Sequence, residues 1–328
     1  MPGTPFYADL DSEYDNFYRK DGTSGHRIDI YTRIYLPYRF KNYFTMEPSV
    51  GLRHTTWYID PSGRDSTEKD TTHNRELYDF KLDLSTELFG IFKINGKSLD
   101  AIKHSIKPQI IYNYTPDKKQ TGYPYFDGID RITANNLVTY SLTNTFTSRS
   151  PSGKTGGYTG KDKEKPSYAY NEFLRIKLEQ SFNIAEERAD RENGRPFSPV
   201  YGEIKFSPSK YISLSADARW STYDGWFVTR NVSGSLSDNR GDSLSAEYRF
   251  QRDSLESILS FINIKIFDNL LFKADHEVNI RDNRRIKTGL GFLYTAQCWS
   301  LDLRYTDEVD DKKYSFMINF TGLGGLGN

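Results

Sequence analysis

The chain has 328 residues, of which 36% are hydrophobic and 15% aromatic, and its 44 Lys and Arg balance its 44 Asp and Glu. A chain without net charge has no overall field to attract nucleic acid, and its aromatic content excludes simple disorder. No apolar run approaches the roughly 20 residues of a transmembrane helix. A polar average with many Tyr and Phe is instead typical of a membrane β-barrel, in which only every second residue meets lipid.

Strict alternation of apolar and polar residues recurs along the chain. Residues 78–89 are the clearest case, with Tyr78, Phe80, Leu82 and Leu84 on one predicted face. No helical period of ten or more residues appears, and 255–267 is the most ambiguous stretch. The alternation predicts about sixteen long strands, in chain order near 5–18, 26–37, 43–58, 76–91, 102–115, 135–149, 169–182, 198–207, 211–221, 226–237, 242–251, 256–267, 270–281, 284–296, 299–307 and 312–322.

We therefore predict an all-β fold: an antiparallel transmembrane β-barrel, or a large part of one, that occupies residues 1–328 as a single barrel region. A soluble β-sandwich would alternate as well. The predicted strands, however, are about 10–15 residues long, whereas strands in globular proteins usually have about 5–6. Their polar faces also carry both signs of charge, as expected for a wet or plugged lumen. The soluble β-rich binding protein remains an alternative.

The charges on the polar faces are candidate lumen-facing groups. One interpretation is mutual ion pairing between neighbouring strands, which is worth little for each pair. The other is contact with phosphates and sugars of a substrate, since guanidinium groups bind phosphate in a bidentate manner. The residues concerned are Arg27, Asp29, Arg33, Glu47, Arg53, Lys81, Asp83, Glu87, Arg175 and Lys177.

Long polar connections are expected at 59–74, 116–134, 150–168 and 183–197. Bacterial barrels place short turns in the periplasm and long loops outside. Counting back from the C-terminus puts 308–311 outside and 296–298 in the periplasm, and only loop 150–168 then lies on the unexpected side. The single cysteine, Cys298, falls in a periplasmic turn, where an oxidising environment makes a bridge to a partner outside this chain possible.

The sequence offers no case for catalysis, a metal or a cofactor. The five histidines lack metal-ligand spacing, and no G-x-S-x-G motif is present. "GLGGLG" (322–327) matches a dinucleotide-binding pattern but has no helix after it.

Several stretches together resemble the C-terminal half of the barrel of the LPS-assembly outer-membrane proteins, the LptD family. They are "PYRFKNYFTMEPSVGLRHTTWYID" (37–60), "IKPQIIYNYTP" (106–116), "YPYFDGIDRITANNLVTYSLTNTFTSR" (123–149), "LEQSFNI" (178–184), the pair Cys298-Trp299, and "FMINFTGLGGLG" (316–327). The third stretch is the most specific and supplies a candidate extracellular loop motif, Phe126, Asp127, Asp130, Arg131 and Asn135. Its acid–arginine pair is expected to brace loops at the outer mouth rather than to bind substrate.

The resemblance implies a Gram-negative outer-membrane barrel that receives lipopolysaccharide from a periplasmic bridge protein and releases it through a lateral gate between its first and last strands. It implies a lipoprotein plug of the LptE type, and a cysteine bridge from Cys298 to an N-terminal periplasmic domain. The last predicted strand would form one side of the gate and also be recognised by the barrel-assembly machinery. Its aromatic face comprises Tyr314, Phe316, Ile318 and Phe320.

Sixteen strands, no signal peptide and no periplasmic jelly-roll domain suggest that the N-terminal domain and first strands of such a protein are missing here. If sixteen strands instead close by themselves, a general outer-membrane porin becomes the better interpretation.

Overall fold

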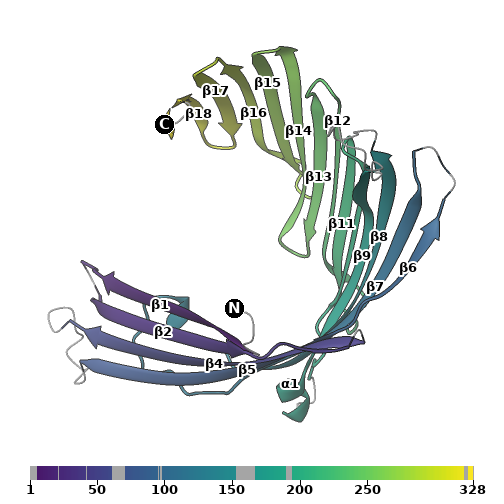
Figure 1. The fold of residues 1–328 in the computed structure, drawn as a ribbon. Coiled ribbons are helices and arrows are strands. Elements are labelled where there is room, and N and C mark those ends of the chain that lie inside the picture. Colours follow the sequence, from purple (N-terminus) through teal and green to yellow (C-terminus); the bar gives the residue numbers. More distant parts are fainter. Residues whose placement is uncertain are drawn as a thin grey trace, which may run out of the picture. The chain divides into compact units, whose positions relative to one another are not determined.

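The computed structural model describes residues 6–20, 22–41, 43–60, 71–94, 96, 98–152, 167–189, 194–320 and 324–327. These residues are almost entirely antiparallel strands (Figure 1). They belong to two compact units, which are described separately. Unit 1 comprises 1–88, 107–142 and 179–198, and unit 2 comprises 89–106, 143–178 and 199–328.

Unit 1 is an antiparallel sheet. β1 pairs with β2, β2 and the short β3 both pair with β4, and β4 pairs with β5. β5 then pairs with the C-terminal half of β7. The elements that lie wholly or partly in this unit are β1 (Tyr7–Phe17), β2 (Gly25–Tyr35), β3 (Tyr38–Phe40), β4 (Phe44–Ile59), β5 (Thr72–Ser85), β7 (Ala101–Thr115), the 3-10 turn η2 (Gly128–Asp130), β8 (Asn135–Ser152), β9 (Ser167–Asn183) and the one-turn helix α1 (Ile184–Arg188).

Unit 2 takes the remaining parts of β7, β8 and β9 and continues as a meander in which each strand from β10 onward pairs with the next. Its other strands are β6 (Leu88–Lys93), β10 (Val200–Ser209), β11 (Ile212–Trp220), β12 (Phe227–Ser237), β13 (Ser243–Gln251), β14 (Leu255–Phe267), β15 (Leu270–Asn279), β16 (Arg284–Thr295), β17 (Trp299–Glu308), β18 (Lys312–Phe320) and β19 (Gly324–Gly327). Within the described ranges no helix is long and apolar enough to cross a membrane.

The predicted all-β, antiparallel class is confirmed, and the ambiguous stretch 255–267 is the strand β14. One predicted strand, 76–91, was wrong, because the structure divides it into β5 and β6. The last ladder pair of β5 is Ser85 with Gln109, and the next position opposite Thr86 is Pro108. Proline has no N–H to donate, so the ladder stops there although the Thr86 N–H still reaches the Pro108 carbonyl at 3.2 Å. Glu87 consequently lies between strands rather than on one.

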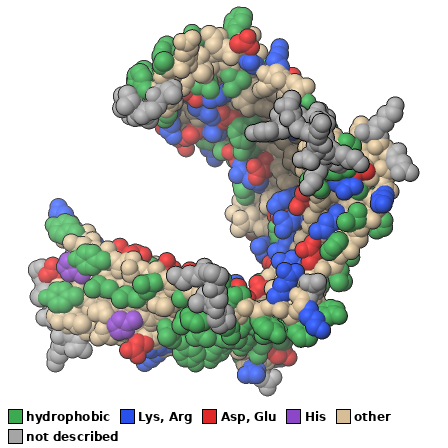
Figure 2. All heavy atoms as spheres, in the orientation of Figure 1, with side chains coloured by type: hydrophobic (Ala, Val, Ile, Leu, Met, Phe, Trp, Pro, Cys, Tyr) green, Lys and Arg blue, Asp and Glu red, His purple; other side chains and the backbone are tan. Residues whose placement is uncertain are grey.

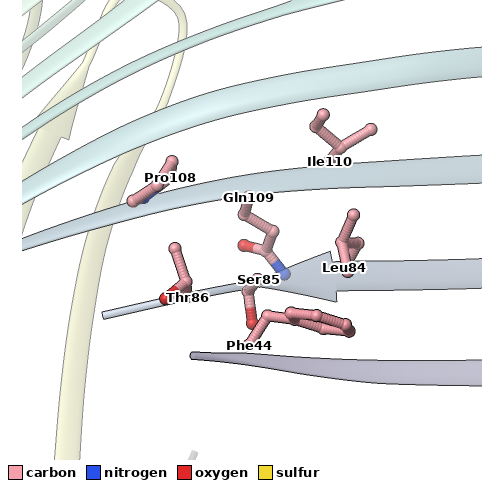
Figure 3. A pocket seen from close by; sticks show the side chains of 7 residues that line it. All are labelled: Phe44, Leu84, Ser85, Thr86, Pro108, Gln109 and Ile110. Carbon is pink, nitrogen blue, oxygen red and sulfur yellow. The ribbon is translucent and has the colours of Figure 1, made fainter. Parts of the chain in front are cut away.

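The interruption leaves an apolar hollow of about 300 Å³ beside Pro108. Figure 3 shows Phe44, Leu84 and Ile110 around it, contributed by β4, β5 and β7. The hollow therefore follows directly from a proline in a strand that would otherwise pair continuously.

The C-terminal strand begins at Lys312, as predicted. Its described part, β18, runs to Phe320, and the predicted end at residue 322 lies outside the described residues, whereas an unexpected strand, β19, pairs antiparallel with Met317–Phe320. The predicted loops 59–74, 150–168 and 183–197 lie largely or partly outside the described residues, so the side on which loop 150–168 emerges stays a prediction.

In both units the sheet has one apolar and one polar face, as the alternation predicted. In unit 1 the apolar face carries large side chains that are strongly exposed, for example Leu10 at 67%, Leu52 at 59% and Ile34 at 50%. In Figure 2 hydrophobic side chains cover the visible face of β1–β5, whereas charged side chains gather over the visible face of the later strands. An apolar face that the protein leaves uncovered is suited to contact with lipid.

The protein interior is correspondingly small. Among the described residues the buried hydrophobic side chains are Trp57, Ile59, Leu77, Ala101 and Phe126. All but Ala101 belong to unit 1, where the segment 116–134 supplies Phe126. Buried charged groups accompany them, and these define the candidate site.

Candidate functional site

The candidate site lies in unit 1, on the polar face of its sheet. Strand register places Arg27 of β2 opposite Asp15 of β1 and opposite Trp57 of β4, with Thr55 of β4 opposite Arg75 of β5. Because side chains alternate along each strand, these five residues share one face. The loop 116–134 contacts that face.

The loop is shaped by its own carboxylates around η2. The Asp127 side chain caps η2 by accepting from the Ile129 N–H at 2.9 Å. The Asp130 side chain returns to accept from the N–H groups of Phe126 at 2.6 Å and Asp127 at 3.0 Å. This reciprocal arrangement is a capping box, in which two side chains satisfy backbone donors at one helical turn. It fixes the direction of both carboxylates.

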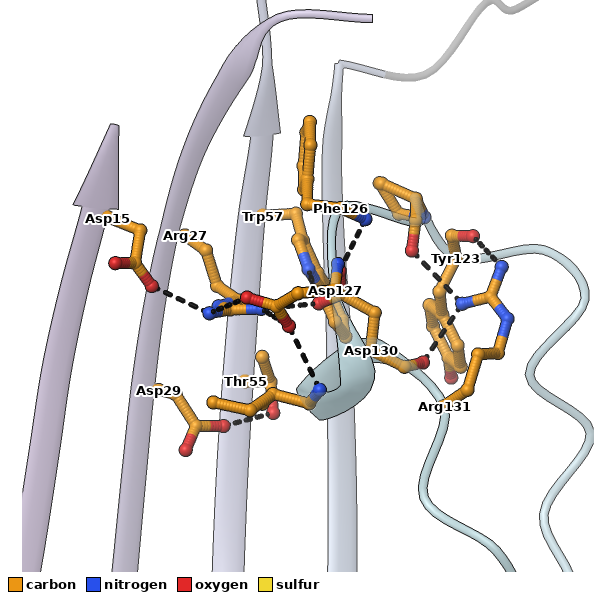
Figure 4. Close-up of polar contacts among 12 residues, drawn as sticks. Asp15, Arg27, Asp29, Thr55, Trp57, Tyr123, Phe126, Asp127, Asp130 and Arg131 are labelled. Carbon is orange, nitrogen blue, oxygen red and sulfur yellow. Dashed lines mark hydrogen bonds and ion pairs between the residues drawn. The ribbon is translucent and has the colours of Figure 1, made fainter. Parts of the chain in front are cut away.

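Arg27 is completely buried and donates hydrogen bonds to both of these carboxylates (Figure 4). Its two terminal nitrogens lie 2.5 and 2.8 Å from the two oxygens of Asp127, and 3.0 Å separates Arg27 Nη1 from Asp130 Oδ1. From β1, Asp15 accepts at 2.6 Å and Glu13 at 3.3 Å. Four carboxylates, two from β1 and two from the loop, thus converge on one guanidinium. The planar fork of arginine is suited to such bidentate contacts.

Asp130 is also fully buried and accepts four hydrogen bonds. Besides Arg27 and the two backbone donors, Trp57 Nε1 donates to its Oδ1 at 2.7 Å. The Trp57 ring in turn stacks on Tyr123 of the loop, with ring centroids 5.3 Å apart. The ionised form of Asp130 is therefore fully hydrogen-bonded, as a buried carboxylate must be.

Arg75 forms the second contact between strands and loop. Its guanidinium donates to the Ile129 carbonyl at 2.7 Å, to Gln120 Oε1 at 2.9 Å and to Thr55 Oγ1 at 2.9 Å. It lies over the Trp57 ring, 5.1 Å from its centroid. We call Arg27, Trp57 and Arg75 of the strands, together with Asp127 and Asp130 of the loop, the loop clamp.

Arg27 shifts the pKa of a carboxyl group in the loop. Its hydrogen bonds hold the pKa of Asp127 below the ordinary value, and the hydrogen bond from the Ile129 N–H acts in the same direction. Asp127 therefore remains ionised at neutral pH.

The loop motif predicted from the sequence divides into three parts. Asp127 and Asp130 enter the clamp, and the Phe126 ring stacks on Phe17 of β1 at 4.3 Å. Arg131 instead holds the loop to itself, because its guanidinium donates to the carbonyls of Tyr123, Pro124 and Asp130. Asn135 begins β8, and its side-chain oxygen is buried without a hydrogen-bond partner within the described part of the chain.

Most of the predicted charges in unit 1 are paired within the sheet. Arg53 donates to both oxygens of Asp29, at 3.0 and 2.9 Å, and Arg33 pairs with Asp79. Glu47 accepts from Tyr7 at 3.2 Å, and Asp83 accepts from Gln109 at 2.8 Å. Lys81 lies on the same face, opposite Ser49 and half-exposed.

Two further candidates lie in unit 2. Lys177 lies over the Tyr201 ring at 5.9 Å, and Arg175 is exposed on the same strand. The structure therefore does not bring these two residues into the loop clamp.

Two glycines on the polar faces make room for carboxylates. A Cβ added to Gly51 would lie 2.2 Å from Asp79 Oδ2, and one added to Gly289 of unit 2 would lie 2.3 Å from Asp275 Oδ1. Asp275 is almost buried and pairs with Lys287 at 3.2 Å and with Arg304. At both positions glycine leaves space for the carboxylate of an ion pair, which a larger residue would displace.

The C-terminal candidates lie on the apolar face of β18. Tyr314 is 81% exposed, Phe316 54% and Phe320 40%, and Ile318 lies in register with Leu301 of β17. Cys298 lies in the turn between β16 and β17, as predicted, and its thiol is free and exposed. Within the described ranges no group of three or more His, Cys, Asp or Glu side chains is arranged to hold a metal ion.

Sequence reasoning found Arg27, Asp127 and Asp130 but missed Asp15, Trp57 and Arg75. The signal for Arg75 was present, because extending the alternation of residues 78–89 backward puts it on the polar face. Trp57 was an apolar residue on that face, which indicates a covering element. That the cover is loop 116–134 could not be inferred from periodicity.

Together, the fold and the site define a two-faced antiparallel wall of the membrane-barrel type, with a polar face covered by a clamped loop. The family model of LPS transport system D, LptD, matches residues 1–279. The chain belongs to this family.

Curated relatives show the same similarity. An LPS-assembly protein LptD of Aromatoleum aromaticum is 24% identical over 96% of this chain, and that of Alkalilimnicola ehrlichii is 24% identical over 98%. That of Nitrosomonas eutropha is 22% identical over 90%. The chain spans about two fifths of the length of these relatives, 40–44%.

Proposed function

We propose that the chain forms part of the wall of an outer-membrane barrel that assembles lipopolysaccharide into the outer leaflet. Family membership and the names of the relatives support this substrate. The two-faced strands support the setting, since an exposed apolar face suits lipid and a charged face suits water, sugars and phosphates.

The loop clamp is the observation that carries the proposal. A general porin needs an open aqueous lumen, whereas here the buried pair of Arg27 and Asp130 fixes a loop over the polar face. A loop held by buried ion pairs is a cover rather than a mobile constriction, because breaking such a pair by removing one partner costs about 3–5 kcal/mol. A covered polar face favours an amphiphilic cargo that leaves sideways into the membrane.

The finer parts of the proposal rest on the family. They are a lateral gate between the first and last strands of the complete barrel, a lipoprotein plug, a periplasmic bridge protein that delivers lipopolysaccharide, and a bridge from Cys298 to a periplasmic domain. The exposed aromatic face of β18 suits recognition by the barrel-assembly machinery. The protein would act by conducting and releasing its cargo, without chemical catalysis.

The test uses the full-length protein in cells depleted of any other copy. Wild-type protein should restore lipopolysaccharide at the cell surface, detected with an impermeant label, and should conduct few ions in planar bilayers. Arg27→Ala should raise the conductance because the loop is released. High conductance of the wild-type protein, with no effect on surface lipopolysaccharide, would favour a porin instead.

A further inference from the structure

A shallow groove of about 360 Å³ lies on the apolar face of unit 2. Its floor consists of small residues, Gly202 of β10 with Ala216 and Ala218 of β11, and Gly202 is paired in register with Ala218. Larger apolar side chains stand around this floor: Ile176, Leu178, Ile204, Phe227 and Val232. Because these three adjacent residues have small side chains or none, the floor of the groove leaves room for a hydrocarbon chain.

One end of the groove is cationic. Arg230 of β12 lines it, although Val232, the next residue of its strand on this face, is apolar. The Arg230 guanidinium lies over Phe250 of β13, 4.4 Å from the ring centroid. Its nearest carboxylate, Glu256, is 4.0 Å away and already accepts from the Tyr248 hydroxyl at 2.8 Å. The guanidinium is therefore positioned over a ring, and its ion pair with Glu256 is at the long end of the range for such pairs.

A second guanidinium adjoins this end of the groove. Arg252, just after β13, stacks on Trp226 at 4.4 Å and donates from Nε to the Phe227 carbonyl at 3.2 Å. Phe227 also lines the groove, so Arg252 adjoins the groove through its contact with Phe227. Stacking on aromatic rings leaves the edges of a guanidinium, which carry the N–H donors, directed to the surroundings.

Strand register orders the groove from a polar end to an apolar end. Trp220 pairs with Phe227, then Ala218 with Arg230, then Ala216 with Val232. The turn at the first of these pairs carries Trp226, 43% exposed. Exposed aromatic and cationic residues mark the interface between membrane and water, and the apolar floor continues from there along the strands.

From this arrangement we propose that the groove binds one molecule of a phosphorylated glycolipid of the lipid A type, with a phosphate at Arg230 and Arg252 and an acyl chain along Gly202, Ala218 and Ala216. The sequence count places this end of the unit 2 strands, with the turn 308–311, outside the cell, where the anionic lipid is lipopolysaccharide. The site would lie on the outer, lipid-facing surface of the wall and hold lipid already in the leaflet. This inference rests on the proposed function only in taking the chain to be part of the wall of an outer-membrane barrel.

The experiment compares variants of the full-length protein purified in detergent, with binding of diphosphoryl lipid A measured by native mass spectrometry. The double variant Arg230→Gln with Arg252→Gln tests the role of the positive charges. Ala218→Leu tests the role of the groove floor, because the larger side chain fills it. Arg240→Gln, an exposed arginine in the turn between β12 and β13, is the matched control. Heat-modifiable migration on a gel shows that each variant is folded.

Wild type and Arg240→Gln should bind diphosphoryl lipid A equally. The double arginine variant should bind at least about tenfold more weakly, as expected for the loss of charge-assisted hydrogen bonds. Ala218→Leu should also weaken binding. Equal binding by all variants would overturn the proposal, as would equally tight binding of phosphatidylglycerol or of dephosphorylated lipid A by the wild type.

Surface lipopolysaccharide in cells is measured separately, so the two proposals can fail independently. We expect the double arginine variant to lose binding in the groove and still to deliver lipopolysaccharide to the cell surface. This result would agree with both the groove and the proposed function. If the wild-type protein binds diphosphoryl lipid A in the groove but delivers no lipopolysaccharide, this would contradict only the proposed function.

Discussion

Arg27 and Asp130 are 103 residues apart in the chain, yet their side chains meet at 3.0 Å with neither exposed to solvent. Arg27 belongs to β2 and Asp130 to a loop that follows β7. A contact this remote in sequence joins a connecting segment to the wall that it covers. The stability of the cover should therefore depend on this pair more than on any surface ion pair.

Replacing Arg27 with alanine should release the loop. The change leaves the buried Asp130 carboxyl group without its cationic partner, and we expect a loss of about 3–5 kcal/mol. Limited trypsin digestion at Lys118 and Lys119 of the folded protein measures release of the loop, and urea unfolding in lipid measures stability. Arg285→Ala is the control, because its pair with Asp307 is on the surface and is worth at most about 1 kcal/mol. Equal effects of both changes would contradict the clamp.

Asp130→Asn should be more damaging than Asp127→Asn. Asparagine has one acceptor oxygen and an NH2 group, so at position 130 its NH2 would face either the Arg27 and Trp57 donors or the two backbone N–H groups. Burying unmatched donors costs about 1–3 kcal/mol. Asp127 is 41% exposed and can use water instead. Loop digestion and the fluorescence of buried Trp57 report both variants, and a larger effect at position 127 would argue against this description.

The clamp should weaken in acid. Arg27 holds the pKa of Asp127 below its ordinary value of 3.8. A depressed folded pKa means that the unfolded chain binds the proton first, so this contribution to stability is complete above the unfolded value and is lost as pH falls through the folded value. Partial exposure of Asp127 reduces its size. Pepsin digestion of the loop between pH 5 and 2 should accelerate below about pH 4, and Asp127→Asn should reduce this dependence.

Gly51→Ala and Gly289→Ala should each disrupt one ion pair. The added methyl group would overlap Asp79 in the first case and Asp275 in the second, so the carboxylate must move off the sheet. We expect each change to destabilise the protein by about 1–3 kcal/mol, the usual cost of overpacking. Gly128→Ala is the control, since a Cβ there meets no atom within 4 Å. Urea midpoints in lipid compare the three, and no difference from Gly128→Ala would refute the steric argument.

Cys298 provides a test of sidedness. Its thiol is exposed in the turn between β16 and β17, and the turn after β17, at residues 309–311, lies at the opposite end of that strand. An impermeant maleimide added to intact cells should label Asp310→Cys in a Cys298→Ser background. In the wild-type background it should reach Cys298 only after the outer membrane is permeabilised and disulfides are reduced. The reverse pattern would invert the predicted orientation.

The sequence by itself determined the alternating faces, most of the strand ranges and the family. These depend on period-two patterning and on local order along the chain, which hold whatever the strands pack against. It also identified Arg27, Asp127 and Asp130, but as members of two separate groups, a charged strand face and a loop motif. Only the tertiary structure joined them, because the path of a loop across a sheet follows from side-chain partners that no local pattern encodes.

Two further features were decided in three dimensions. The break between β5 and β6 depends on Pro108 lying opposite Thr86, which is a matter of register between strands rather than of either segment alone. Trp57 is buried because Tyr123 and Arg75 cover it, although its strand reads as an ordinary alternating one. Patterning thus fixed which face each residue occupies, and packing decided which polar groups are buried together, since only burial turns scattered charges into a clamp.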